Sequence, residues 1–371
     1  MIAYNNDWLR NIYVRKQAEE ALHEGCITQE AYDAIFRSKS VGFYTPNYFV
    51  RAGFAILTLI VVNSFVTGLM AAKFGIFGSS AFSFFIVLFG GACYFGVELL
   101  VRSRHHYNSG VDNILIWMAA CLICGGMTES FEHGAQSGIT LSLLYFVVCG
   151  ALALRFADSV LSIAATLAFF CVVFYCCKQA DALARIAIPF LMILFSGLAY
   201  FVSARMISNH SFLLYRTCLH CVRIVSLLVM FGSGNYYMVR ELSDDMFNLG
   251  LRPQDPLPLG WFFWAWTFIV PFVYIACGIR NKNITLIRVG IPLIAVAVLT
   301  FRYYHSIMAP EMAMLLGGAV LFISSFSLIR YLHTPKNGFT FKAVNYAQKD
   351  PVAANVTGEL FDRSKDIFLQ R

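Results

Sequence analysis

Ten long apolar runs, separated by polar connections, dominate the sequence. They cover roughly 49–71, 80–101, 112–129, 137–154, 159–177, 184–204, 217–235, 260–279, 284–301 and 311–331. An α-helix needs about 20 apolar residues to cross the hydrocarbon core of a bilayer. Because hydrocarbon offers no hydrogen-bond partners, the backbone of such a run is satisfied only in a helix. The runs therefore predict an all-α, polytopic transmembrane bundle of about ten helices.

Charge supports the same class of protein. Only 13% of the residues are charged, whereas soluble domains carry about 25%. The formal net charge of +7 comes from residues beside the apolar runs and not from one basic block. This pattern is typical of the loops of membrane proteins. We therefore expect the lipid bilayer, and no nucleic acid, as a partner.

The distribution of Lys and Arg predicts the orientation. Arg102, Arg104, Arg155, Arg205 and Arg216 fall in alternate connections, on the same side as the basic head, whereas the opposite connections are poorer in Lys and Arg. Cytoplasmic loops carry this excess. Both termini are predicted to lie in the cytoplasm.

The sequence predicts three regions. Residues 1–45 form a helical hairpin, with Asn5, Asn6 and Asp7 as N-cap candidates for its first helix, Thr28 as the cap of the second, and a helix-ending glycine at Gly25. Residues 46–332 form the bundle, and residues 333–371 form a cytoplasmic tail. Two short helices cannot hold a core alone. Residues 5–39 should therefore pack on the bundle, self-associate or bind a protein partner.

The longest outer connection runs from Tyr236 to Gly260, and we expect it to be turn-rich and non-helical near its end. It contains Arg240 and several acidic residues, which suit either a solvated loop or a cation-collecting surface. Cysteine spacing predicts no cofactor or metal. Of the 11 cysteines, Cys121 and Cys218 open C-x-x-C pairs, but the two pairs fall at different depths in their spans.

The first candidate site lies on the cytoplasmic side. Arg216, His220 and Arg223 are spaced to share one face of a helix. Glu98 and Arg102 end the second apolar run, and Arg104, His105 and His106 follow them. The group suits an anionic headgroup or substrate, with Glu98 balancing Arg223. The alternative is a set of snorkelling arginines without function. Asp112 reads either as a proton acceptor or, preferably, as a helix cap.

The second candidate site lies on the outer side. Glu129, Glu132 and His133 end the third run, and His305 and Glu311 bracket the connection between the last two. Carboxylates and histidines in this number suit proton relay or a divalent ion. The alternative is ordinary polar residues at a water interface. No residue is assigned a catalytic role.

The entry to the membrane carries a resemblance. Leu22-His23-Glu24-Gly25-Cys26-Ile27-Thr28-Gln29-Glu30 forms the hairpin turn, and Phe43-Tyr44, Asn47 and Arg51-Ala52-Gly53 lead into the first run. This layout resembles bacterial polytopic inner-membrane proteins with a short cytoplasmic helical hairpin, over about the first 60 residues. The resemblance implies a bacterial inner-membrane location and no known chemistry.

Three functions fit these observations. The leading hypothesis is a transporter-like or channel-like bundle for a small or amphiphilic solute, since polar residues lie at both ends of many spans. An alternative is a structural or assembly subunit that docks partners through the hairpin and tail. A third is a membrane-embedded lipid-modifying enzyme that uses Glu129, Glu132 and His133.

Overall fold

The computed structural model describes residues 2–73, 79–131, 137–179, 182–247, 259–304 and 310–331. These residues are almost entirely helical and contain no named strand, only one isolated bridge between Tyr44 and His106. The elements are α1 (Asn6–His23), α2 (Gln29–Ser38), α3 (Tyr48–Lys73), α4 (Ser79–Arg104), α5 (Val111–Phe131), α6 (Ser137–Phe156), α7 (Ser159–Lys178), α8 (Ala182–Ile207), η1 (His210–Tyr215), α9 (Arg216–Gly234), α10 (Tyr236–Phe247), α11 (Gly260–Arg280), α12 (Ile284–Tyr304) and α13 (Pro310–Tyr331).

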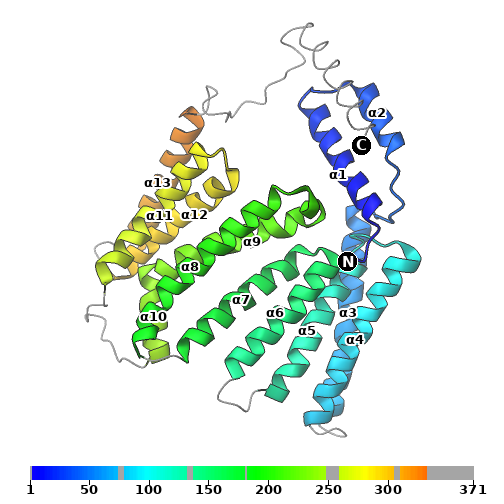
Figure 1. Cartoon of the computed structure of the whole chain (residues 1–371), viewed down its shortest axis with the longest axis horizontal. Coiled ribbons are helices and arrows are strands. Elements are labelled where there is room, and N and C mark those ends of the chain that lie inside the picture. The colour runs from blue at the N-terminus through cyan, green and yellow to red at the C-terminus, as the bar shows by residue number, and fades with distance from the viewer. Residues whose placement is uncertain are drawn as a thin grey trace.

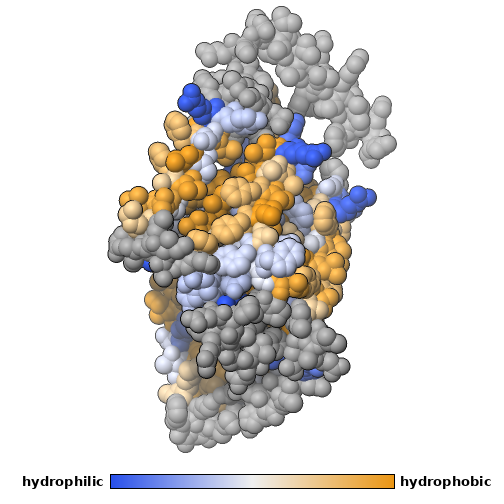
Figure 2. Space-filling view, turned by 90° about the vertical axis from the view of Figure 1, so that its left-hand side faces the viewer, coloured by the Kyte–Doolittle hydropathy of each residue, from blue (hydrophilic) through white to orange (hydrophobic). Residues whose placement is uncertain are grey.

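Ten helices in the described part are long and apolar enough to cross a membrane. They coincide with the ten predicted runs, so the all-α polytopic bundle is confirmed and the chain is a multi-pass membrane protein. Phenylalanine, leucine and isoleucine side chains remain exposed along these helices, and apolar residues cover much of the face in Figure 2. Such a surface suits lipid as solvent, because water would favour burying it.

The N-terminal helices end where local chemistry predicts. The Asn5 side chain accepts the N–H groups of Asp7 and Trp8 at the start of α1. Gly25 adopts φ 71°, and the N–H groups of Gly25 and Cys26 bond to carbonyls of the last turn of α1 at 3.0 and 2.8 Å. This is a Schellman ending. Thr28 caps α2 through the N–H of Ala31 at 3.3 Å.

The hairpin of α1 and α2 lies against one end of the bundle, which we call the hairpin end (Figure 1). The Ala3 N–H donates to the Arg155 carbonyl at 2.8 Å. Tyr4 is buried edge-to-face against Tyr107, with ring centroids 5.1 Å apart. The α4–α5, α6–α7, α8–α9 and α11–α12 connections lie at this end.

The spans pack in two groups. In the first half, α4 to α7 share a core with the N-terminal segment, and α3 packs on α4 and α5. In the second half, α9, α11 and α12 share a core to which α8 contributes Tyr200. The halves meet where α7 packs on α8 and α9, and Ser162 donates to the Cys218 carbonyl at 3.1 Å.

The outer connection contains a helix that the sequence did not predict. It is α10, which follows α9 after a break at Asn235 and packs on α9 and α11. Tyr236, Val239 and Arg240 are buried there. Arg240 is thus a packed residue and not a charge in a solvated loop. The proline-containing residues 248–258 lie outside the described residues.

Candidate functional site

Arg223 is the cation that the bundle buries near the hairpin end of the second half. It lies seven residues after the first residue of α9, about 10 Å along the helix at 1.5 Å per residue. Its exposed fraction is only 8%, so the side chain does not reach out of the helix packing. Arginines in spans usually extend toward the interface. Arg223 is instead enclosed by protein.

The groups around Arg223 come from three parts of the second half. Arg223 Nη2 lies 3.4 Å from the Tyr200 hydroxyl on α8, and its Cζ lies 5.2 Å from the centre of the Tyr200 ring. Asn283, at the α11–α12 corner, points its Nδ2 to the same hydroxyl at 3.4 Å. The contacts are long for N–H···O hydrogen bonds. The three side chains therefore lie close together, but the hydrogen bonds between them are weak.

The charge of Arg223 has no counter-ion among the described residues. Its buried Nε has no hydrogen-bond partner, and the ion pairs found in the described part of the chain involve other residues. The sequence supplies a reason, since no Asp or Glu occurs from 182 to 240 or from 256 to 310. Helices α8, α9, α11 and α12 therefore contain no carboxylate side chain. Glu241 belongs to the neighbouring α10. A buried guanidinium without compensation is costly.

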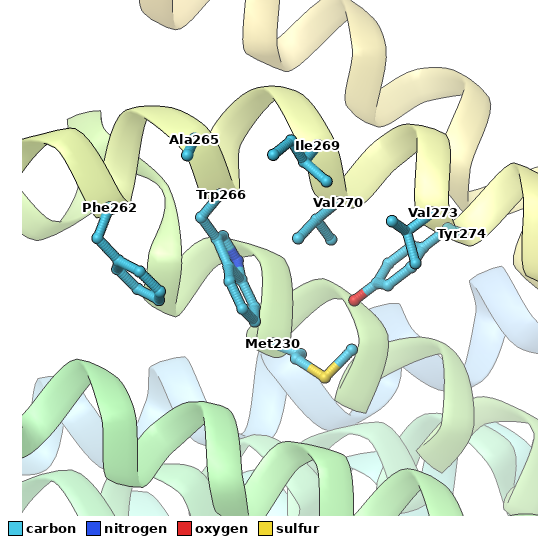
Figure 3. A pocket seen from close by; sticks show the side chains of 8 residues that line it. All are labelled: Met230, Phe262, Ala265, Trp266, Ile269, Val270, Val273 and Tyr274. Atoms are coloured by element: carbon cyan, nitrogen blue, oxygen red, sulfur yellow. The ribbon is translucent and has the colours of Figure 1, made fainter.

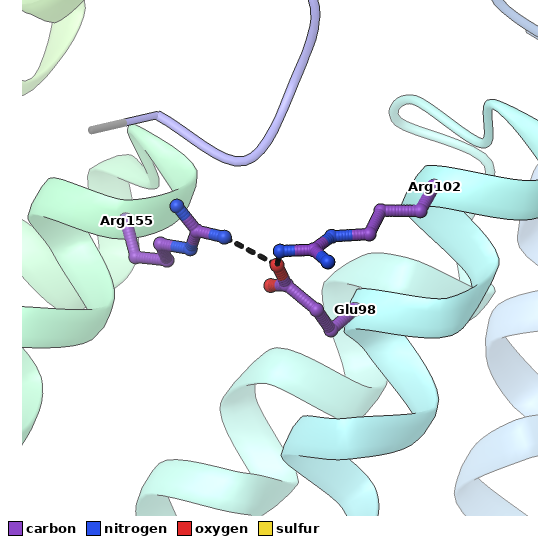
Figure 4. A network of polar contacts seen from close by, with 3 residues as sticks. All are labelled: Glu98, Arg102 and Arg155. Atoms are coloured by element: carbon purple, nitrogen blue, oxygen red, sulfur yellow. Dashed lines mark hydrogen bonds and ion pairs between the residues drawn. The ribbon is translucent and has the colours of Figure 1, made fainter.

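Glu98 does not balance Arg223, and that prediction is wrong. Glu98 Oε1 pairs with Arg102 one turn along α4, at 2.8 Å, and with Arg155 of α6 (Figure 4). The reason is packing: α4, α5 and α6 share one core, whereas Arg223 belongs to the other. The Glu98 side chain is 13% exposed and Arg102 69%. Arg155 is therefore the structurally important partner.

The α4–α5 loop is a folded polar structure built around Asp112. This carboxylate, fully buried, accepts the N–H groups of Asn108 at 2.7 Å and Ser109 at 2.9 Å. Asp112 lies in the first turn of α5 and reaches back to the loop that precedes the helix. Its bonds go to loop N–H groups and not to those of the helix start, so Asp112 organises the α4–α5 loop and is not the helix cap that the sequence predicted.

The two histidines of this loop, which the sequence placed near the first candidate site, contact neighbouring side chains of the protein. His106 Nδ1 lies 2.9 Å from the Ser109 hydroxyl, and the His105 ring packs edge-on to Trp8. Burial and the Asp112 carboxylate raise the pKa of Tyr4 and of Tyr107 beside it. At the hairpin end of the first half, these polar side chains are therefore bonded to other groups of the protein.

The remaining predicted residues fall into two groups. Arg216 Nη1 donates to the Tyr13 hydroxyl of α1 at 2.6 Å, which docks the hairpin. His220 is partly buried, one turn before Arg223. The outer candidates lie outside the described side chains: Glu129, whose backbone is in α5, Glu132, His133, His305, and Glu311, whose backbone is in α13. Among the residues that the structure describes, no three His, Cys, Asp or Glu side chains are grouped so that they could hold a metal ion.

Sequence reasoning missed a polar cluster at the far end of the second half. Asn235 is 1% exposed; its Nδ2 donates to Thr300 at 3.2 Å and its Oδ1 accepts the Tyr237 N–H at 3.1 Å. Arg240 Nη1 donates to the Tyr236 hydroxyl at 3.0 Å. The signal available was Asn235 after a glycine at the end of an apolar run, which is typical of a helix break.

An apolar groove of 340 Å³ runs along α11 beside α9. Phe262, Trp266, Val270 and Tyr274 line it from α11 and Met230 from α9 (Figure 3). The Tyr274 hydroxyl already donates to the Leu227 carbonyl at 3.1 Å. With no charged side chain in its lining, the groove cannot supply the missing counter-ion of Arg223.

The fold and the buried charges define a multi-pass α-helical membrane protein with a polar site inside one half. No family model, curated protein or solved structure matches the chain. The resemblance of the first 60 residues therefore stays a prediction.

Proposed function

We propose that the chain is a transporter-like or channel-like bundle for a small or amphiphilic solute in the bacterial inner membrane. In this proposal the hairpin end faces the cytoplasm, in line with the Lys and Arg distribution. The observation that carries the proposal is Arg223, a nearly buried cation within a spanning helix and without a counter-ion among the described residues.

The energetic argument concerns the cost of that residue. An ionised side chain within a span is expensive, and such residues commonly mark solute or ion pathways. A structural role would be supported by a carboxylate or several short hydrogen bonds, as Glu98 supports Arg155. Arg223 has a ring face and one long hydroxyl contact. A solute that binds the Arg223 guanidinium as it crosses the membrane would explain why a charged side chain is present there.

Reconstituted vesicles test the proposal directly. Proteoliposomes receive concentration jumps of chloride, phosphate, acetate and a tetraalkylammonium salt on a solid-supported membrane, and the charge movement is recorded. We expect a solute-dependent current that protein-free liposomes lack. Because Arg223→Gln removes a charge-assisted hydrogen bond, it should raise the half-saturating concentration about tenfold or more.

The matched control is Arg205→Gln, since Arg205 ends α8 at the same end of the bundle but is exposed. It should leave the current unchanged. Responses indistinguishable from empty liposomes for all four solutes would contradict the proposal.

One observation favours an assembly subunit as the second candidate. Helix α2 buries none of its residues, and Phe36 is 45% exposed with the Arg15 guanidinium over its ring. Residues 5–39 thus keep an amphipathic surface after α1 has docked. Crosslinking from a photoreactive residue at Ala34, on exposed α2, should yield a discrete heavier species if a partner binds there. Loss of that species in Phe36→Ser would support the surface.

A further inference from the structure

We propose that Arg223, Tyr200 and Asn283 form a binding site for an oxyanion of the phosphate type. The inference names the ligand class of the site that the proposed transport function uses, and in that sense rests on it. Binding itself requires no transport, so the two are separable by experiment.

Charge is the first argument. The segments 182–240 and 256–310 contain no Asp or Glu, yet Arg205, Arg216, Arg223, Arg280, Lys282 and Arg288 lie in the hairpin-end part of them. Five of these six can be hydrated because they are exposed. Arg223 cannot be hydrated in this way, because only 8% of it is exposed. No carboxylate among the described residues compensates it, and a bound anion is the compensation that we propose.

Donor geometry is the second argument. A guanidinium offers five N–H donors in a planar fork that matches two oxygens of an oxyanion. In Arg223 only Nη2 has an acceptor in the described structure, and that contact is 3.4 Å long. The Asn283 amide contributes a further donor group from the α11–α12 corner, also at 3.4 Å from the same hydroxyl. Donors therefore converge in excess of acceptors.

Shape decides between a phosphate-type anion and a simple halide. The Arg223 Cζ lies over the Tyr200 ring, 5.2 Å from its centre, so the ring occupies one side of the guanidinium and leaves the N–H edge of the fork as the place where the donors can bind a ligand. Binding at that edge favours an anion with two oxygens over a spherical ion. Inorganic phosphate and the phosphodiester of an anionic lipid share this chemistry.

Thermal unfolding of the purified full chain in neutral detergent measures binding. A thiol-reactive dye reports exposure of the buried cysteines Cys93, Cys124, Cys149 and Cys218. The titration uses inorganic phosphate, against chloride at equal ionic strength, which holds screening constant. A ligand that binds only the folded state raises Tm. We expect a rise of a few degrees with phosphate, its loss in Arg223→Gln, and its retention in Arg205→Gln.

A second arm identifies the source of the anion. The chain is placed in nanodiscs of phosphatidylcholine alone or with added phosphatidylglycerol. Stabilisation by free phosphate only supports a soluble ligand. Stabilisation by phosphatidylglycerol, lost in Arg223→Gln, supports a lipid headgroup. No stabilisation in either arm, or an equal rise in native chain and Arg223→Gln, overturns the proposal.

Tyr200→Phe keeps the test decisive if Arg223→Gln does not fold. This change removes the one hydroxyl that Arg223 contacts and keeps the ring. Because Arg223 keeps its charge in this variant, the phosphate-dependent rise in Tm should persist, and its absence overturns the proposal. A chain that binds phosphate but gives no current in proteoliposomes would retain this inference and lose the transport function.

Discussion

In the first half of the bundle two arginines at the hairpin end, Arg102 and Arg155, meet a carboxylate, whereas in the described part of the second half Arg223 does not. Glu98 pairs with Arg102 and Arg155, and Asp112 and Asp158 satisfy backbone N–H groups just before α5 and at the start of α7. In the second half Arg223 meets a tyrosine ring and a long hydroxyl contact. The residues before α1 contact the first half at Arg155 and Tyr107, and α1 itself is held by Arg216 of the second half through the Tyr13 hydroxyl.

The two halves differ in whether their buried charged groups have partners. A buried polar group with partners helps to fix one structure, and a buried charge without them lowers stability. The first half is thus a scaffold locked by its own residues. The second half holds Arg223, whose burial no other described residue compensates with a charge.

The largest effect should come from breaking the pair in the first half. Glu98→Gln leaves Arg155, 26% exposed, without its counter-ion. Breaking a fully buried pair costs ~3–5 kcal/mol, and partial exposure reduces this to about 2 kcal/mol. Unfolding in SDS–detergent mixtures measures the loss. Arg102→Gln, at a 69% exposed side chain, should cost less than about 0.5 kcal/mol. Equal losses in the two variants would refute the assignment of Arg155 as the main partner.

An effect of opposite sign should follow in the second half. Arg223→Met replaces an uncompensated buried charge with an apolar side chain of similar length. Such replacements can stabilise a protein by ~1–4 kcal/mol, and we expect about 1 kcal/mol in a buffer free of oxyanions. The same SDS unfolding assay applies. A marked destabilisation would show that Arg223 has adequate partners within the protein, and the contrast between the halves would disappear.

The smallest predicted effect concerns Tyr4, which packs the N-terminal segment against the first half of the bundle. Burial and Asp112 raise the pKa of Tyr4 above its ordinary value of 10.0. A tyrosine with a raised folded pKa contributes stability that is complete below the unfolded pKa and is lost as pH rises toward the folded one. The N-terminal segment should therefore loosen above about pH 10. Trp8 fluorescence, in a chain whose other tryptophans are replaced by Phe, follows the change.

Tyr4→Phe keeps the ring and removes this titration. The pH dependence of Trp8 fluorescence above about pH 10 should become shallower in the variant, although Tyr107 still titrates nearby. An identical profile in both chains would mean that Tyr4 does not control docking of the segment.

Local sequence determined the spans and the helix ends. Each apolar run needs only its own residues to require a helix in lipid. The caps at Asn5 and Thr28 and the glycine ending at Gly25 depend on groups within a few positions. These features were accordingly predictable without any knowledge of how the helices pack. The absence of Asp and Glu from 182–240 and 256–310 was also visible in the sequence. It became informative only because the structure shows that Arg223 is buried.

Tertiary structure alone decided which charges pair. Glu98 and Arg155 are 57 positions apart, and Asn235 and Thr300 are 65 apart; no periodicity in either segment specifies the partner. Helix α10 and its buried Arg240 likewise depend on packing against α9 and α11. Hydrophobicity places a helix in the membrane, but its rotation and neighbours follow from side-chain fit between helices. That fit is a property of the assembled bundle.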